Sequence, residues 1–147
     1  DRSGADLATL VTPATAEEAV RPQLVKAAIA WDNGCDQPAT NGNRFGTALY
    51  FSRAPIPAGA TEYNHHVGVY GWRRSALSAF VRLPPSPLEL AEKLEQLRAL
   101  EAGMTIAVAQ INAAPGGVDT NDDLMATRRR LGHGSADRHR KRPSTRR

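Results

Sequence analysis

The sequence contains a single cysteine, Cys35, and no apolar run that approaches the roughly 18 residues needed to span a bilayer. One cysteine cannot form an internal disulfide, so the composition favours a reducing cytoplasm and no membrane partner. The first residues lack the pattern of a secretory signal peptide, and they do not begin with Met. There is no internal repeat, no P-loop and no G-x-G-x-x-G motif, so neither of these glycine-rich phosphate-binding loops is present.

Apolar residues are nevertheless plentiful, because 41% of the 147 residues are hydrophobic, which is enough for one compact domain. The charge is uneven. Residues 132–147 contain six Lys or Arg against one acid, whereas the net charge of the whole chain is only +4. We therefore expect a folded domain over residues 1–131 and a disordered basic tail over 132–147. Nucleic-acid binding through this tail is an alternative function, which the nearly neutral domain disfavours.

Strand and helix signals alternate along the chain, which predicts an α/β layered domain. Strands are expected at residues 6–13, 23–31, 47–53, 65–72 and 106–112. The second and third of these strands should form an antiparallel hairpin. An α/β domain that contains such a hairpin should have a mixed sheet. A capping box of Thr15 and Glu18 predicts a short helix after the first strand, and Thr120 with Asp123 predicts another near the end of the domain.

One long helix is expected over residues 86–103, with Ser86 as N-cap, Glu89 completing the capping box and Gly103 after the last turn. Its apolar stripe should face the core, and Glu95 and Gln96 lie beside that stripe. On periodicity alone, both would be ordinary surface residues of this helix.

Three other polar residues stand out by position. His66 and Tyr70 should share one face of the strand at 65–72, with Gly68 leaving open space over that face. This pair fits either a ligand contact or aromatic packing in the core. Asp119 lies at a strand-to-helix turn, where a carboxylate either holds a metal ion or caps the helix.

Four stretches of the chain resemble the 3-deoxy-manno-octulosonate cytidylyltransferase family: TALYFSRAPIP, HHVGVYGWRR, PPSPLELAEKLEQLRALEAGM and PGGVDTNDDL. The resemblance covers about residues 5–131 and keeps the family's order and spacing. Its departures are Gln23 for Asn, His65 for Arg, Trp72 for Tyr and Asn121 for Pro.

The resemblance implies a fold similar to that of the nucleotide-diphospho-sugar transferases, lacking the N-terminal nucleotide-binding half. It implies transfer of CMP from CTP to 3-deoxy-D-manno-octulosonate (Kdo), giving CMP-Kdo and pyrophosphate for lipopolysaccharide synthesis, with Mg²⁺ as cofactor. It also implies that Asp119 is catalytic and coordinates the metal. Residues implied to contact the sugar acid are His66, Tyr70, Glu95 and Gln96.

The resemblance also shows which of the family's motifs this sequence lacks. The family's second metal-binding Asp and its basic, glycine-containing phosphate loop have no counterpart in this sequence. We therefore expect the chain to be the sugar-acid-binding half, inactive by itself. A homodimer is a further possibility, and a non-catalytic remnant is the alternative. The motifs do not decide whether the substrate is Kdo or its 8-amino analogue.

The missing phosphate loop yields the first testable prediction. Titration of the 147-residue chain with CTP and Mg²⁺ in a calorimeter should give no micromolar binding, and no CMP-Kdo should form when Kdo is added. The reason is that phosphate charge needs positioned backbone N–H groups and cations, which the recognised motifs do not supply. Micromolar CTP binding by the chain alone would contradict this interpretation.

Overall fold

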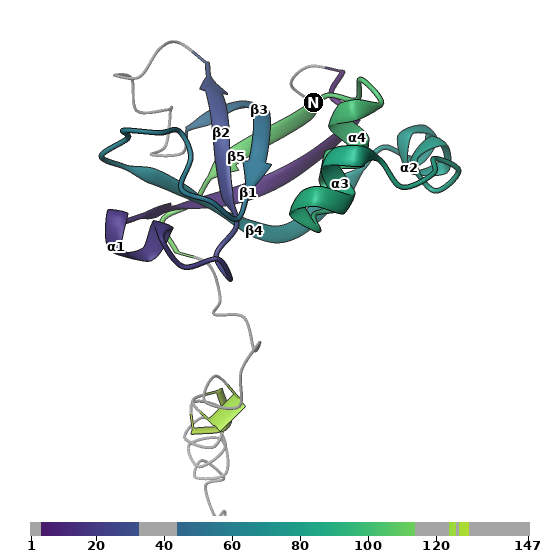
Figure 1. Ribbon diagram of the computed structural model, residues 1–147. Coiled ribbons are helices and arrows are strands. Elements are labelled where there is room, and N and C mark those ends of the chain that lie inside the picture. The colour runs from purple at the N-terminus through teal and green to yellow at the C-terminus, as the bar shows by residue number, and fades with distance from the viewer. Residues whose placement is uncertain (1–3, 33–43, 114–123, 126, 130–147) are drawn as a thin grey trace, which may run out of the picture. The chain divides into compact units, whose positions relative to one another are not determined.

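The computed structural model describes residues 4–32, 44–113, 124–125 and 127–129. The chain divides into two compact units, Asp1–Ala114 and Pro115–Arg147. The elements of the first unit (Figure 1) are β1 (Leu7–Ala14), α1 (Ala16–Ala19), β2 (Lys26–Trp31), β3 (Phe45–Ser52), β4 (Tyr63–Trp72), α2 (Arg74–Phe80), α3 (Pro87–Glu92), α4 (Gln96–Glu101) and β5 (Ile106–Gln110).

In the second unit, residues 124, 125 and 127–129 are helical, within the helix predicted after Thr120. Asp119, that helix cap and the basic tail lie outside the described residues, so the boundary at residue 131 stays a prediction. Among the helices that the structure describes, none is long and apolar enough to cross a membrane.

The predicted mixed sheet is present, and its strands close on themselves in the order β1-β4-β2-β3-β5. β5 returns to β1 as a parallel neighbour, whereas the other pairs are antiparallel. The β2–β3 pair is the hairpin expected from the sequence. Its register shifts by one residue between Ala28 and Ile29, which leaves Leu49 on β3 without a partner and exposed.

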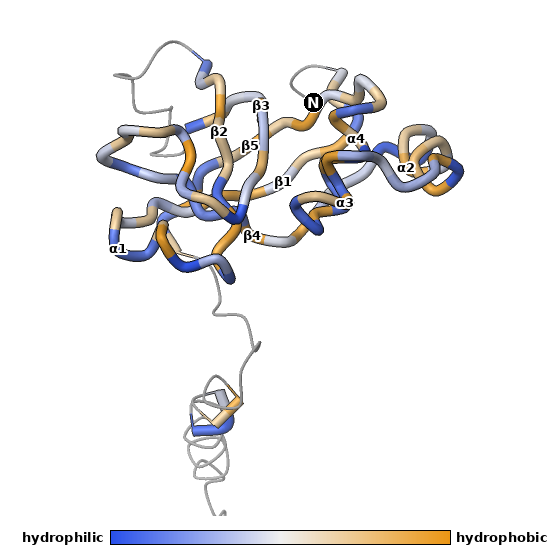
Figure 2. Tube along the Cα trace, in the orientation of Figure 1, coloured by the Kyte–Doolittle hydropathy of each residue, from blue (hydrophilic) through white to orange (hydrophobic). Residues whose placement is uncertain are grey.

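Alternation along the strands places the core inside the closed sheet. On β1, Leu7, Thr9 and Val11 are buried, whereas Ala8 faces outward. The sheet and the helices together enclose one main cluster of buried apolar residues: Leu7, Val11, Ala27, Ala48, Phe51, Leu94, Leu97, Ala99, Ile106 and Val108. In Figure 2 the hydrophobic colour runs along β1 and β5, which are paired neighbours. Helices α2, α3 and α4 gather at one end of this unit and α1 at the other (Figure 1).

The helix predicted over 86–103 is in fact two helices, so that prediction is wrong in its middle. Lys93 adopts a left-handed conformation with φ 57°, which ends α3, and α4 begins at Gln96. The sequence offers no Gly or Pro at this point, and a left-handed lysine is unfavourable by about 1 kcal/mol. The predicted end holds, since Gly103 has φ 76° after the last turn of α4.

Tertiary contacts at the end of α3 hold this break in place. The Glu92 carboxylate accepts hydrogen bonds from the Ser52 hydroxyl at 2.6 Å and from the Arg53 backbone N–H at 3.0 Å. The Arg53 guanidinium donates to the Glu92 carbonyl at 3.2 Å. Leu94 then turns into the core and is 4% exposed. The helix therefore stops where its last turn is attached to the end of β3.

Lys26 at the start of β2 is fully buried, which is rare for a lysine. Its ammonium donates to the carbonyls of Arg21 at 3.1 Å and Leu24 at 2.6 Å, and also to that of Arg53. Three N–H donors thus meet three acceptors. Burial, and then the charge of Arg53, lower the pKa of Lys26. This contact ties the turn before β2 to the chain after β3.

Replacing Lys26 with Met should destabilise the fold strongly. The change removes three donors and leaves the carbonyls of Leu24 and Arg53 unpaired, whereas that of Arg21 still accepts from the Leu24 N–H. The free energy of unfolding should therefore fall by roughly 3 kcal/mol or more. Urea denaturation followed by circular dichroism measures this loss. The matched control is Arg82→Met, which alters an exposed cation and should stay within about 0.5 kcal/mol of the wild type. Equal effects of the two changes would contradict a structural role for Lys26.

Candidate functional site

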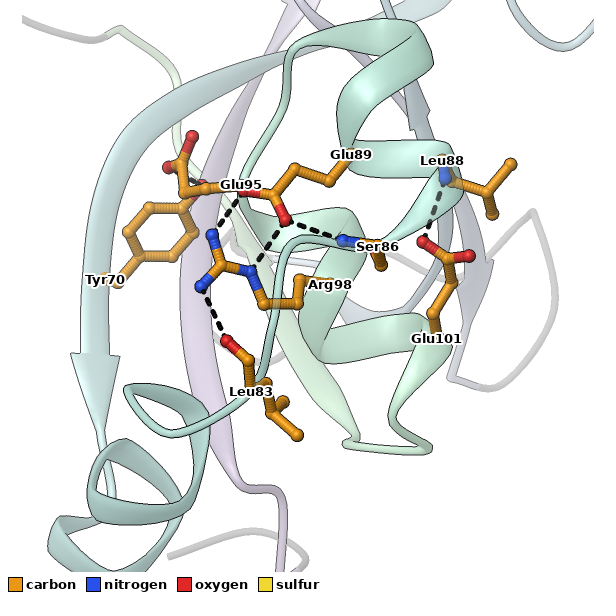
Figure 3. A network of polar contacts seen from close by, with 8 residues as sticks. All are labelled: Tyr70, Leu83, Ser86, Leu88, Glu89, Glu95, Arg98 and Glu101. Atoms are coloured by element: carbon orange, nitrogen blue, oxygen red, sulfur yellow. Dashed lines mark hydrogen bonds and ion pairs between the residues drawn. The ribbon is translucent and has the colours of Figure 1, made fainter.

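The structure brings three of the predicted site residues into contact. His66 and Tyr70 lie on β4 with their ring centroids 5.5 Å apart, and the Tyr70 hydroxyl donates to a Glu95 carboxylate oxygen at 3.3 Å (Figure 3). Gln96 follows Glu95 directly as the first residue of α4. Residues from a strand and from the start of a helix, about 30 positions apart in the chain, therefore meet at one place.

Thr9 on β1 fixes the state of the His66 ring. The register between β1 and β4 shifts after Thr9, and the Thr9 hydroxyl lies 2.9 Å from the Val69 carbonyl and 3.2 Å from the Val67 carbonyl. It also lies 2.9 Å from His66 Nε2. Because the hydroxyl proton goes to a carbonyl, its lone pair accepts a hydrogen from Nε2. We therefore assign His66 as the Nε2–H tautomer, with Nδ1 left as an acceptor.

The environment keeps His66 uncharged. Its side chain is 7% exposed, and its ring packs edge-on against Phe51 at a centroid distance of 4.8 Å. Burial, and then the neighbouring His65, lower the pKa of His66 to about 4. A neutral imidazole at physiological pH provides hydrogen bonds and a flat apolar surface, and it does not act as a cation.

Tyr70 and Glu95 form a polar pair at the edge of the buried region. Burial, and then the Glu95 charge, raise the pKa of Tyr70 well above its ordinary value, so the phenol keeps its proton. Glu95 is exposed, as expected for a helix surface. The pair therefore presents a carboxylate with free lone pairs beside a phenol oxygen that is still able to accept.

Gln96 departs from the expectation for a surface residue. Its side chain is 2% exposed, and no hydrogen bond joins its amide to another described residue. The amide is not among the fully enclosed polar atoms without a partner in the described chain, so its atoms keep slight access to solvent. A polar group that is nearly buried and has no protein partner is available to a ligand. Gln96 follows the break at Lys93 and begins α4, where it is buried together with Leu97 and Ala99.

A network of polar contacts fixes the start of α4 (Figure 3). Arg98 forms a two-point ion pair with Glu89 of α3, and its guanidinium also donates to the Leu83 carbonyl at 3.3 Å. Glu101, the last residue of α4, also accepts from the Leu88 backbone N–H at 3.0 Å. Both contacts join the first turn of α3 to α4, and together they hold the two helices against each other.

A row of rings links this network to the site. The Arg98 guanidinium lies 4.9 Å from the centroid of Phe80, which packs against Trp72 at 4.8 Å. Trp72 in turn lies 6.3 Å from Tyr70. The position of the Tyr70 ring is therefore tied, through two further rings, to the arginine that joins α3 and α4.

Sequence reasoning missed three residues that position the site, namely Arg98, Thr9 and Glu92. Thr9 and Glu92 act through partners 57 and about 40 residues away, which leave no local pattern. Arg98 left no local signal either, because Glu89 and Arg98 are nine residues apart and would lie on opposite faces of the one helix predicted there.

A metal site is not found in the part of the chain that the structure describes. No three His, Cys, Asp or Glu side chains come together there in a way that could hold an ion. Asp119, the predicted metal ligand, lies outside the described residues.

Comparison with known proteins shows which family the chain resembles. A family model described as "Cytidylyltransferase" matches residues 1–106. The chain belongs to the cytidylyltransferase family. One curated relative comes from Parvibaculum lavamentivorans and is named 3-deoxy-manno-octulosonate cytidylyltransferase. It is 50% identical to this cytidylyltransferase chain over 131 residues, and the match covers 88% of this chain and 47% of the relative. A relative of the same name from Rhodopseudomonas palustris is 52% identical over 128 residues, covering 86% and 49%.

A solved structure is also similar to this cytidylyltransferase chain. It is a CMP:2-keto-3-deoxy-manno-octonic acid synthetase complexed with CTP, 35% identical, with a TM-score of 0.73. The match covers 89% of this chain and 51% of that one. The predicted mixed-sheet, nucleotidyltransferase-like fold is thereby confirmed. The chain spans about half the length of the curated relatives and of the solved structure that it matches.

The lowered pKa of His66 predicts that the stability of the fold depends on pH. The pKa is about 4 in the folded chain and about 6.5 in an unfolded one, so the unfolded chain binds more protons between these values. Stability should therefore fall as the pH drops from about 6.5 towards 4, by roughly 3 kcal/mol at most from this residue. His66→Gln should flatten that dependence in urea denaturation at a series of pH values.

Nitrogen NMR provides a direct check on the same assignment. At about pH 6 the His66 ring should be neutral and protonated at Nε2. Thr9→Val, which removes the acceptor while keeping the shape, should abolish that tautomer preference. A charged His66 ring at this pH in the wild type would contradict the assignment.

Proposed function

We propose that this chain forms the sugar-acid-binding half of a 3-deoxy-manno-octulosonate cytidylyltransferase. In the complete reaction the anomeric hydroxyl of Kdo attacks the α-phosphate of CTP, the bond to the β-phosphate breaks, and CMP-Kdo and pyrophosphate result. The observation that carries this proposal is the contact between the Tyr70 hydroxyl and the Glu95 carboxylate, directly beside the nearly buried side chain of Gln96. The names of the relatives support the choice of substrates.

The proposed contacts match the chemistry of an acidic sugar with many hydroxyl groups. Gln96 offers both a donor and an acceptor, the Glu95 carboxylate accepts from hydroxyls, and Tyr70 accepts through its remaining lone pairs. Neutral His66 adds an acceptor at Nδ1 and a flat ring surface. A sugar that lacks a matching hydroxyl would leave one of these groups unpaired, which costs about 1–3 kcal/mol and gives specificity.

The role of these residues is to bind and orient rather than to transfer protons. With the pKa of His66 near 4 and that of Tyr70 raised, neither group titrates near neutral pH. Rate enhancement in phosphoryl transfer comes mainly from positioning and charge neutralisation. We propose Asp119 as the ligand of Mg²⁺, which would supply that neutralisation when bound. A cytoplasmic location and a homodimer remain predictions.

Kdo binding to the chain tests the proposal without requiring turnover. Titration with Kdo, followed by NMR, should shift signals of His66, Tyr70 and Gln96. Tyr70→Phe should weaken binding about fivefold, the loss expected for one hydrogen bond. The matched control is Tyr63→Phe, because Tyr63 packs in a separate cluster with Ala14 and Ala19 and should leave binding unchanged.

Gln96→Leu should separate binding from stability. The change removes a buried amide that lacks a described partner, so the free energy of unfolding should stay the same or rise, while Kdo binding should fall about tenfold or more. Urea denaturation measures the first and NMR titration the second. A marked loss of stability would show that Gln96 is a structural residue, and unchanged binding would remove the central support for the proposed site.

A further inference from the structure

The glycines of the described chain differ in why they are glycine. Three of them have a left-handed backbone, with φ between 70° and 77°: Gly4, Gly59 and Gly103. At Gly46 the reason is space, because an added Cβ would lie 2.4 Å from the Ala30 carbonyl oxygen. Gly68 of β4 has neither reason. Its φ lies outside the left-handed region, and an added Cβ would meet no described atom within 4 Å.

The fold by itself does not require glycine at position 68. Inside a strand, glycine is less favourable than alanine, because it loses more chain entropy on folding and has no side chain to pack. Alanine would suit the backbone at position 68 and would meet no described neighbour. A glycine of this kind typically marks a place where a ligand or another part of the chain approaches the strand closely.

A bulge in β4 contains this glycine. Two neighbours on β1, Thr9 and Leu10, pair with Tyr70 and Val67, so the two residues in between have no partner on β1. The Thr9 hydroxyl lies 3.2 Å from the carbonyl of residue 67 and 2.9 Å from that of residue 69. The backbone is thus held on both sides of residue 68, and its position is fixed without a side chain of its own.

The glycine lies on the same face of β4 as the site residues. Successive residues of a strand face opposite sides, and a bulge of two extra residues keeps this alternation in phase. Val69 and Gly71 line an apolar cleft of about 650 Å³ together with Ala8, an outward-facing residue of β1. The alternate set of β4 therefore faces the other side: His66, Gly68 and Tyr70.

Groups suited to a sugar border the space over Gly68. The space is reachable from solvent, because Gly68 is exposed. The rings of His66 and Tyr70, before and after it on the strand, have their centroids 5.5 Å apart. Glu95 accepts from the Tyr70 hydroxyl at 3.3 Å and keeps further lone pairs. An open space against a strand, bordered by an imidazole, a phenol and a carboxylate, suits a ring that carries many hydroxyl groups.

We propose that Gly68 is a specificity-determining residue, against whose backbone the sugar acid lies in the space between His66 and Tyr70. This inference rests on the proposed function and adds the surface that the sugar ring contacts. With only a hydrogen atom at Gly68, the ring reaches the strand and its hydroxyls stay within reach of the neighbouring polar groups. A methyl group there would fill the space and move the ring outward, beyond the usual hydrogen-bond limit of about 3.2 Å.

Gly68→Ala in the full 147-residue chain separates this role from a structural one. The free energy of unfolding, measured by urea denaturation, should stay the same or rise, because the added methyl meets no described atom and alanine suits a strand better. The Kd for Kdo, measured by NMR titration, should rise at least about tenfold, as expected when more than one hydrogen bond is lost. Gly68→Ser should weaken binding similarly, because the added volume and not its polarity is the cause.

The same strand supplies a matched control, Gly71→Ala. Gly71 also has an ordinary φ and no described atom within 4 Å of an added Cβ, but it lines the cleft on the opposite face. Gly71→Ala should therefore leave Kdo binding unchanged. Equal weakening by the two variants would overturn the proposal. A marked loss of stability in Gly68→Ala would also overturn it, because the glycine would then be required by the fold.

Titration with a second sugar acid, glucuronate, distinguishes this inference from the proposed function. Kdo binding that is equal in the wild type and in Gly68→Ala would support the proposed function and overturn the role of Gly68. Binding of glucuronate but not of Kdo, lost in Gly68→Ala and kept in Gly71→Ala, would support the role of Gly68 and count against Kdo as the substrate. A wild-type chain that binds neither sugar acid would overturn both.

Discussion

The attachment of the end of α3 to the end of β3 is the contact on which the site depends. Glu92 accepts from the Ser52 hydroxyl and the Arg53 N–H, and these bonds fix the last turn of α3. The chain leaves that turn through the left-handed conformation of Lys93. The cost of that conformation is offset by the burial of Leu94 and by the hydrogen bonds of Glu92.

From this break follows the placement of the polar groups. Gln96 becomes the first residue of α4 and turns inward, while Glu95 reaches the Tyr70 hydroxyl on β4. The ion pair of Glu89 with Arg98 then holds the two helices in this arrangement. The result is a set of donors and acceptors fixed in advance, which reduces the ordering that a ligand must impose. A rigid scaffold of this kind suits an enzyme that works by positioning its substrates.

The buried polar groups of this unit differ in how fully they are hydrogen-bonded. Lys26 satisfies each of its buried donors, whereas the Gln96 amide has no partner among the described residues and the Tyr70–Glu95 pair keeps acceptor capacity in reserve. Unsatisfied capacity weakens the fold and brings no structural benefit. The same contrast holds at a larger scale: β1 is paired on both sides, but within the described chain β4 is left open along residues 67–72. The open acceptors of the Tyr70–Glu95 pair are those that the proposed sugar acid would use.

Local patterns in the sequence determined the strands, the β2–β3 hairpin, the Thr15–Glu18 capping box and the turn at Gly103, because these depend on neighbours a few residues apart. They also placed His66 and Tyr70 on one face of β4. The break at Lys93, the Thr9 contact that sets the His66 tautomer and the burial of Gln96 were decided only by tertiary structure. The first two depend on partners 40 and 57 residues away, and local propensity carries no information about contacts at that distance.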